Sequence, residues 1–589
     1  MAIYKIIASE LGTDTGPFVI KSNTGAILAT GVTRAQLLAG FTINVPAGTT
    51  SVTVTNVATN TTCVTDQTFQ IPNEGFWEME KTNVEQVSDH YGIIATAYSG
   101  PVETFVADDV VGIYDGVVTG TTWTILGGPE AITGTTYNGG GLLIVTAANT
   151  NATTNVQAGA TVQLGYDLDS YTGSFGGTTT VAAGATVNVV GANEPNGRAV
   201  FSTLTNNGAV NITGKDACGE GLFTSSAATT NNGTISIARS MWKIGTSLAG
   251  TGTINVADGA TFNTSSISIP AGQVFNINGC GWCNASGSKQ GALRFEGANT
   301  TFASTINVQT PSCIKNFGAS AMTISGLMQG SAALNVGTIG NPVAGITLFT
   351  NQANTYSGTV TSDGTLVGIQ LDSMKYATLT AVNGGQITSN NGTFKSIYGS
   401  DATSYLTGAG NTFITDNGIT QFDGRFLWNG QGTLHNVYFR GDAGNQLTLT
   451  AKNNTVNMYV EYGSKLTLQG ASLTGAPNGQ VRVAYGSTIS AGTSTDASCM
   501  VLWLDATSKF EVRAVGTGTG LLTVNGGVNF QPGWKVDLPD AMAPGVYTIM
   551  KHYSNTTTLP TTGVNNTGRT VSYAWNNAVN PRELVMTLA

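Results

Sequence analysis

The chain has 589 residues, of which 24 are basic and 33 acidic, and charged residues make up only 10% of it. This composition excludes several classes of protein. A net charge of −9 without a Lys/Arg cluster excludes a nucleic-acid partner, because phosphate recognition needs a basic surface. A hydrophobic content of 41% excludes a disordered chain. No apolar run approaches the roughly 18 residues of a membrane span, so no membrane partner is expected.

Residues 1–72 are predicted to form a small β-sandwich-like module. Short alternating strands run from Tyr4–Ile7 to Ser51–Thr55 and are separated by turn residues. One short helix is expected between them, because Thr33 and Gln36 have the spacing of a capping box. A small first module of this kind is typical of docking or spacing rather than of catalysis.

Residues 73–119 are predicted to be a connector with one amphipathic helix. The segment from Asn73 to Tyr91 is rich in charge, and Trp77, Val84 and Tyr91 recur every seven residues. One interpretation is a helical neck at which protomers associate. The other is a single helix packed on its own domain.

Residues 120–530 carry a repeat that predicts a parallel β-helix (solenoid). Short strands with two apolar residues flanking a polar one recur at intervals of 25, 23, 25 and 19 residues, measured at Val162, Val187, Val210, Ile235 and Ile254. A coil of about 22 residues with alternating inward side chains is typical of this fold, and about 18 coils are expected. A string of immunoglobulin-like sandwiches is the alternative.

Glycines mark the expected corners of the coils, and the chain ends differently. Gly159 and Gly184 precede strands, and Asn-Gly pairs stand at Gly208 and Gly233, where a Cβ would clash. Residues 531–589 contain longer strands and are predicted to form a C-terminal β cap that covers the last coil. The expected fold class is therefore all-β, with module, solenoid and cap in that order.

Cysteines and carboxylates are the first chemical candidates. Cys280-Gly-Trp-Cys283 has the spacing of a redox pair or half a metal site, but its Asn/Gly-rich surroundings favour a solenoid loop with free or bridged cysteines. A glycan-cleaving enzyme needs paired carboxylates. The available pairs are Asp108 with Asp109, Asp167 with Asp169, and Asp416 with Asp423. No pair is distinguished from turn residues, so no catalytic residue, metal site or cofactor is predicted.

Tryptophans are the candidate binding residues. Trp242, Trp282, Trp428 and Trp503 occur along the solenoid. An aromatic ring on a β-helix face can stack on a sugar. Trp242, Trp282 and Trp428 are accordingly predicted as glycan contacts, although core packing at a coil corner is the alternative that we favour.

Two segments carry a resemblance to a known family. Gly12–Phe18 and Gly31–Gly40 resemble the N-terminal module of virion fibre proteins from tailed phages of gut Bacteroidota, including the crAss-like phages. The body resembles the parallel β-helices of phage fibres, tailspikes and autotransporter passengers, and Gly545–Leu588 is similar to an autotransporter passenger end. The absence of a signal peptide argues against an autotransporter.

The resemblance implies a head or tail fibre rather than an enzyme. Its N-terminal module would bind capsid or tail proteins of the virion, and the shaft would self-associate as a homodimer or homotrimer and contact host-surface glycans. The protein would be made in the host bacterial cytoplasm and exposed on the particle exterior. A tailspike-like polysaccharide depolymerase and a capsid decoration protein without receptor binding are the alternatives.

Overall fold

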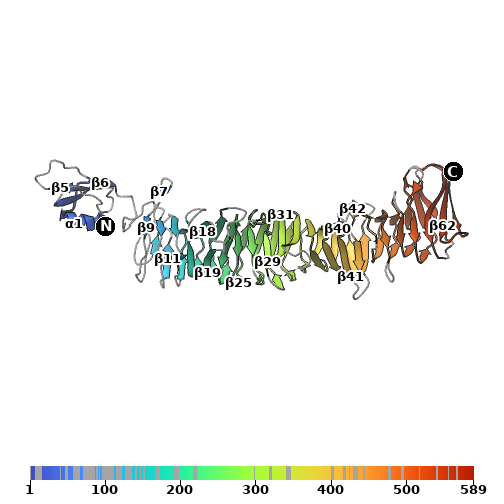
Figure 1. Cartoon of the computed structure of the whole chain (residues 1–589), viewed down its shortest axis with the longest axis horizontal. Helices are drawn as coiled ribbons and strands as arrows, with labels where there is room; N and C mark the ends of the chain where they lie inside the picture. Colours follow the sequence, from blue (N-terminus) through green and yellow to red (C-terminus); the bar gives the residue numbers. More distant parts are fainter. Residues whose placement is uncertain are drawn as a thin grey trace. The chain divides into compact units, whose positions relative to one another are not determined.

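The computed structural model describes residues 2–6, 16–39, 41–46, 49, 51–57 and 67–70, short strands between 86 and 149, and residues 153–589 with short gaps. The gaps after residue 153 are 166–172, 192–197, 216–221, 265, 285, 297–298, 318–320, 340–345, 400–402, 416–418, 424, 429–434, 442–444, 453, 475–478, 493–495, 516–517, 539–541, 555, 557 and 566–567. The chain divides into two compact units, Met1–Asp216 with Glu220–Thr246, and Ala217–Gly219 with Ser247–Ala589. Strands dominate the described residues (Figure 1).

The N-terminal module of the first unit is built from antiparallel strands, as predicted. β2 (Phe18–Ser22) lies between β3 (Ile27–Val32) and β5 (Ser51–Asn56), and β5 also pairs with β6 (Gln67–Gln70). A second pair joins β1 (Ala2–Ile6) to β4 (Phe41–Val45). Their core contains Phe18, Ile20, Val32, Leu37, Ile43, Val52 and Val54.

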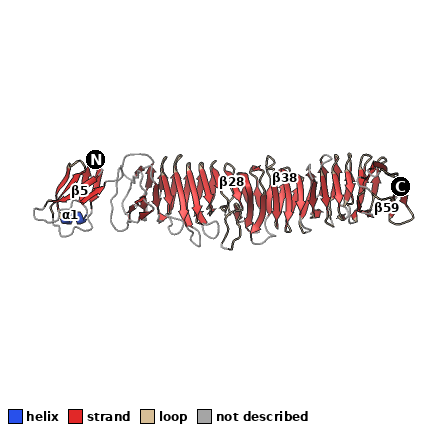
Figure 2. Ribbon diagram, turned by 90° about the horizontal axis from the view of Figure 1, so that it is seen from above, coloured by secondary structure: helices blue, strands red, loops and turns tan. Residues whose placement is uncertain are grey.

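Among the described residues there is a single helix, α1 (Arg34–Ala39) (Figure 2). It begins with the predicted capping box. The Gln36 N–H donates to Thr33 Oγ1 at 3.2 Å, and the Thr33 N–H donates to Gln36 Oε1 at 2.8 Å. Two backbone donors at the helix start are thereby satisfied. Leu37 turns into the core of the module.

The connector differs from its prediction. β7 (Gln86–Val87) and β8 (His90–Tyr91) form an antiparallel pair, so the helix expected to reach Tyr91 is wrong at its C-terminal end. Trp77 and Val84 lie outside the described residues. Parallel pairing begins already at β9 (Ile93–Ala95), which pairs with β10 (Gly112–Tyr114), within the segment predicted as connector.

A parallel β-solenoid of about 15 turns runs across residues 153–562. The turns are fewer and longer than expected, because loops of variable length interrupt the coils. Parallel register also excludes immunoglobulin-like sandwiches, whose strands pair antiparallel. In Figure 2, strands such as β28 (Val274–Gly279) and β38 (Met374–Val382) run across the second unit as successive layers.

The apolar residues read from the repeat form the inward columns. In the first unit Val162 aligns with Val187 and Val187 with Val210, which aligns with Ile235. All four side chains are fully buried. In the second unit Ile254 begins a similar column, in register with Phe275. Column packing replaces the compact core of a globular domain.

Corner glycines occupy positions with a left-handed backbone or with no room for a side chain. Gly159 and Gly184 have φ values of 82° and 80°. A Cβ on Gly233 would meet the backbone carbonyl of Gly208, its counterpart one coil earlier. The Asn-Gly corners predicted from the sequence are therefore required by the close approach of consecutive turns.

The C-terminal strands form the expected cap. β59 (Gly545–His552) pairs antiparallel with β62 (Arg582–Leu588), and β62 with β61 (Val571–Asn576). The Trp575 ring of β61 packs edge-on to His552 at 4.6 Å, and its Nε1 donates to the Thr558 carbonyl at 3.3 Å. Parallel pairing continues past residue 530, through β58 (Lys535–Leu538) and β60 (Thr561–Asn565), so cap and solenoid overlap in sequence.

Candidate functional site

The tryptophans predicted to contact glycans do not form a surface site. Trp242 in β24 (Met241–Lys243) is 1% exposed, and its Nε1 donates to Ser225 Oγ at 3.1 Å. Trp282 is 8% exposed. Neither ring offers a face to a sugar, so glycan contact is wrong for these two residues and core packing is correct. The Trp428 side chain lies outside the described residues.

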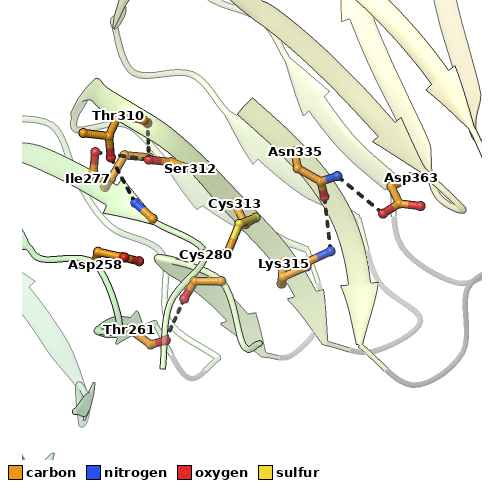
Figure 3. Close-up of a disulfide and its surroundings, with 12 residues drawn as sticks. Asp258, Thr261, Ile277, Cys280, Thr310, Ser312, Cys313, Lys315, Asn335 and Asp363 are labelled. Atoms are coloured by element: carbon orange, nitrogen blue, oxygen red, sulfur yellow. Dashed lines mark hydrogen bonds between the residues drawn. A yellow bond between two sulfur atoms is a disulfide. The ribbon is translucent and has the colours of Figure 1, made fainter. Parts of the chain in front are cut away.

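Cys280 forms a disulfide with Cys313 rather than with Cys283 (Figure 3). The register that aligns Gly279 with Ser312 on consecutive coils brings the two Cα atoms to 4.5 Å. The disulfide therefore joins neighbouring coils and is not a Cys-X-X-Cys redox pair. Within the described residues, no group of three His, Cys, Asp or Glu side chains could hold a metal ion.

A polar row beside this disulfide also joins coils (Figure 3). Lys315 Nζ donates to Asn335 Oδ1 at 3.2 Å, and Asn335 Nδ2 donates to Asp363 Oδ2 at 3.4 Å. Burial lowers the pKa of Lys315, an effect that the charge of Asp363 opposes. Each side chain of the row satisfies its neighbour, so the row is a crosslink of the coils.

Of the predicted carboxylate pairs, only one residue lies within the described part of the chain. Asp108, Asp109, Asp167, Asp169 and Asp416 lie outside it. The remaining candidate, Asp423, accepts a hydrogen bond from Thr450 Oγ1 at 2.6 Å.

The structure instead aligns Glu511 in β53 (Lys509–Glu511) with Asp537 in β58. Both carboxylates are ion-paired, Glu511 with Lys465 and Arg513, and Asp537 with Lys509 at 3.2 Å. Each carboxylate is thus engaged by at least one cation of the solenoid. This pair therefore fits a structural ion-pair network better than an active site.

An outward column of aromatic side chains crosses five coils of the second unit. The strands that carry it are β41 (Tyr405–Ile414), β44 (His435–Arg440), β46 (Asn457–Glu461), β49 (Gln480–Val483) and β52 (Val501–Leu504). Their register aligns one outward position in every strand. We call this set the aromatic column: Phe413, Tyr438, Tyr459, Arg482 and Trp503.

The rings of the aromatic column stack on one another. Phe413 and Tyr438 have centroids 4.9 Å apart and planes 27° from parallel, and Tyr438 and Tyr459 have values of 4.5 Å and 15°. The Arg482 guanidinium lies 4.0 Å from the centroid of Trp503 and continues the stack. Stacked rings cover each other's faces, so the middle of the column presents ring edges and tyrosine hydroxyls.

A second stack lies at the turns that follow these strands. Tyr462 and Tyr485, which we call the turn stack, are 54% and 55% exposed. The aligned position of the next coil is Ala506, since Thr488 pairs with Lys509. Alanine has no ring, so the row of rings ends at Tyr485, whose side chain is exposed. An exposed aromatic side chain can stack on a pyranose.

Arg440 connects the two stacks. Its guanidinium lies 4.6 Å from the centroid of Tyr438 and 5.8 Å from that of Tyr462. Its Nε donates to Glu461 Oε2 at 2.8 Å. The aromatic column and the turn stack are therefore one surface, which we call the aromatic face.

Amide side chains border part of the aromatic column, two residues before Phe413, Tyr438, Tyr459 and Arg482. Asn436 Nδ2 donates to Asn411 Oδ1 at 3.2 Å, and Asn457 Nδ2 donates to Asn436 Oδ1 at 3.1 Å. Gln480 is the next residue of the row in register, and its backbone N–H donates to Asn457 Oδ1 at 3.2 Å. Rings beside amides, hydroxyls and a guanidinium supply the groups that bind the apolar face and the hydroxyls of a sugar.

His435 lies behind this face and is not part of it. Its side chain is buried, its Nδ1 lies 3.0 Å from the Leu427 carbonyl, and its Nε2 lies 3.0 Å from Thr412 Oγ1. A carbonyl only accepts, so Nδ1 carries the proton. Burial lowers the pKa of His435 to about 4, which keeps the imidazole neutral at neutral pH.

No protein-family model, curated protein or solved structure matches this chain. No helix in the described part of the chain has both the length and the hydropathy to cross a membrane.

Proposed function

We propose that this chain is a structural fibre protein of a phage virion that binds glycans on the host surface through the aromatic face. The observation that carries the adhesive role is the pair of exposed, stacked tyrosines Tyr462 and Tyr485 beside the aromatic column. A β-helix solenoid fits a fibre or tailspike-like shaft. Weak sugar contacts suffice for adhesion when a particle carries many copies.

The virion setting of the proposal comes from the resemblance of Gly12–Phe18 and Gly31–Gly40 to phage fibre modules. In this proposal residues 1–72 attach to capsid or tail proteins, and the chain acts as a homodimer or homotrimer. Immunogold electron microscopy with antibody to residues 120–540 tests it on particles. Label on heads or at the tail tip supports a head or tail fibre, and unlabelled particles contradict the virion role.

Glycan binding is tested with purified full-length protein on a glycan array. We expect the double variant Tyr462→Gly/Tyr485→Gly to lose at least tenfold in affinity, equivalent to about 1.4 kcal/mol. Glycine suits the left-handed backbone of both positions, with φ of 59° and 54°. Tyr376→Ser/Tyr398→Ser removes two other exposed rings and serves as the matched control.

The outcomes separate the alternatives. Unchanged binding by the Tyr462/Tyr485 variant places adhesion elsewhere. Release of oligosaccharides from a bound polysaccharide favours a tailspike-like depolymerase. Absence of binding to every glycan favours a capsid decoration protein without receptor binding.

A further inference from the structure

Arg482 is the one cation within the aromatic column, and among the described residues it has no carboxylate at ion-pair distance. The neighbouring cations are compensated: Arg440 by Glu461, and Lys465 and Arg513 by Glu511. The contact of Arg482 is with the Trp503 ring, at 4.0 Å from its centroid. Its Nε is buried without a hydrogen-bond partner.

The stacking contact with Trp503 does not use the hydrogen-bond donors of the guanidinium. Stacking engages the flat face of the group, whereas its N–H donors lie in its plane. These donors form a fork that matches a carboxylate, sulfate or phosphate in a bidentate manner. Contact with Trp503 also fixes the plane of the group, which reduces the entropy lost when an anion binds.

The acidic residues on the neighbouring strand and turn have other partners. Glu461 is engaged by Arg440 at 2.8 Å. Asp505, at the turn after Trp503, accepts hydrogen bonds from the Tyr485 N–H at 2.9 Å and from Ser508 Oγ at 2.7 Å. Burial would raise the pKa of Asp505, but these and the Thr507 hydrogen bonds outweigh it and lower that pKa.

We infer that Arg482 binds the anionic group of an acidic glycan. The side chains of Trp503, Tyr459 and Gln480 contact the sugar that carries this group. This inference rests on the proposed function and specifies its ligand class. A neutral glycan bound over Arg482 would displace water from the guanidinium without supplying an anion to pair with it, which is unfavourable. The aromatic face therefore selects sugars with a carboxylate, sulfate or phosphate over neutral ones.

The test compares full-length protein on polygalacturonate and on the same polymer after reduction of its carboxylates to alcohols, together with a panel of sulfated, phosphorylated and neutral glycans. We expect at least tenfold tighter binding to acidic polymers at low salt, with the preference shrinking as salt is raised. Arg482→Gln should abolish the preference, and Arg482→Lys should keep part of it, because an ammonium retains charge but not the fork.

Lys535→Gln removes the same charge from an exposed position that is not part of the aromatic face, two coils beyond Thr488, and should leave the preference unchanged. Circular dichroism and thermal melts confirm that each variant is folded. Equal binding to acidic and neutral polymers, or an unaltered preference in Arg482→Gln, overturns the inference. Binding restricted to neutral glycans overturns the inference of an acidic ligand but leaves the adhesive function in place. Binding to no glycan in the panel overturns both the inference and the adhesive function.

Discussion

Tyr462 and Tyr485 stack across consecutive turns, with ring centroids 5.1 Å apart and planes 7° from parallel. Each ring extends from a residue with a left-handed backbone, with φ of 59° and 54°, followed by Gly463 and Gly486. A bulky residue is rare in this region of backbone space. Two such residues in one stack indicate that the ring positions are maintained against a conformational cost of order 1 kcal/mol each.

This backbone predicts that two truncations at Tyr485 differ in their effect on stability. Tyr485→Gly removes the ring and relieves the left-handed cost, whereas Tyr485→Ala removes the ring and retains the cost. We expect the glycine variant to be more stable than the alanine variant by about 1 kcal/mol. Urea unfolding of the two proteins measures the difference, and an alanine variant as stable as the glycine one contradicts the assigned turn conformation.

The disulfide between Cys280 and Cys313 should stabilise the second unit. It closes a sequence separation of 33 residues, for which the loss of unfolded-chain entropy corresponds to about 3 to 4 kcal/mol. The double variant Cys280→Ser/Cys313→Ser is expected to unfold at correspondingly lower denaturant concentration. Peptide mapping without reduction checks the pairing, and a Cys280 to Cys283 crosslink would show the assignment to be wrong.

His435 should make the solenoid sensitive to acid. The pKa of this imidazole falls from 6.5 to about 4 on folding, because burial disfavours the cation. Between these pH values the unfolded chain binds a proton that the folded chain does not. The contribution of His435 to the free energy of unfolding is therefore complete above pH 6.5. It is lost as the pH falls towards 4, by up to about 3 kcal/mol.

His435→Gln provides the control for this pH dependence. It should be less stable than the parent at pH 7, because the hydrogen bonds to Leu427 and Thr412 are altered. Its stability should decline less between pH 7 and pH 4.5, as measured by urea midpoints. Equal declines in both proteins would assign the acid sensitivity to other groups, such as His552, whose pKa burial also lowers.

Gly233 and Gly527 form a matched pair for the spacing of the coils. A Cβ on Gly233 would collide with the Gly208 backbone, whereas a Cβ on Gly527 would have nothing within 4 Å. We expect Gly233→Ala to lose about 1 to 3 kcal/mol and Gly527→Ala to change stability by less than about 0.5 kcal/mol. Similar melting temperatures for the two variants would contradict the close approach at the Asn-Gly corner.

The sequence by itself was enough for the all-β class, the solenoid, the capped helix and the buried columns at Val162, Val187 and Ile254. These features depend on local patterns: alternation every second residue, glycine at corners, and a capping pair three residues apart. The same patterns missed the aromatic column, although Val-Tyr-Phe, Met-Tyr-Val, Val-Arg-Val and Leu-Trp-Leu each place a large side chain between two inward residues.

Only the tertiary structure decided which outward side chains meet. Contacts along a solenoid are made between coils, and the length of each coil depends on loops that vary by several residues. The separation from Tyr438 to Tyr459 therefore differs from that between Tyr459 and Arg482, and Cys280 meets Cys313 instead of its near neighbour Cys283. Whether a side chain points inward follows from alternation within one strand. Which side chains stack on one another depends on the register between strands, and the hydrogen bonds between whole coils set that register.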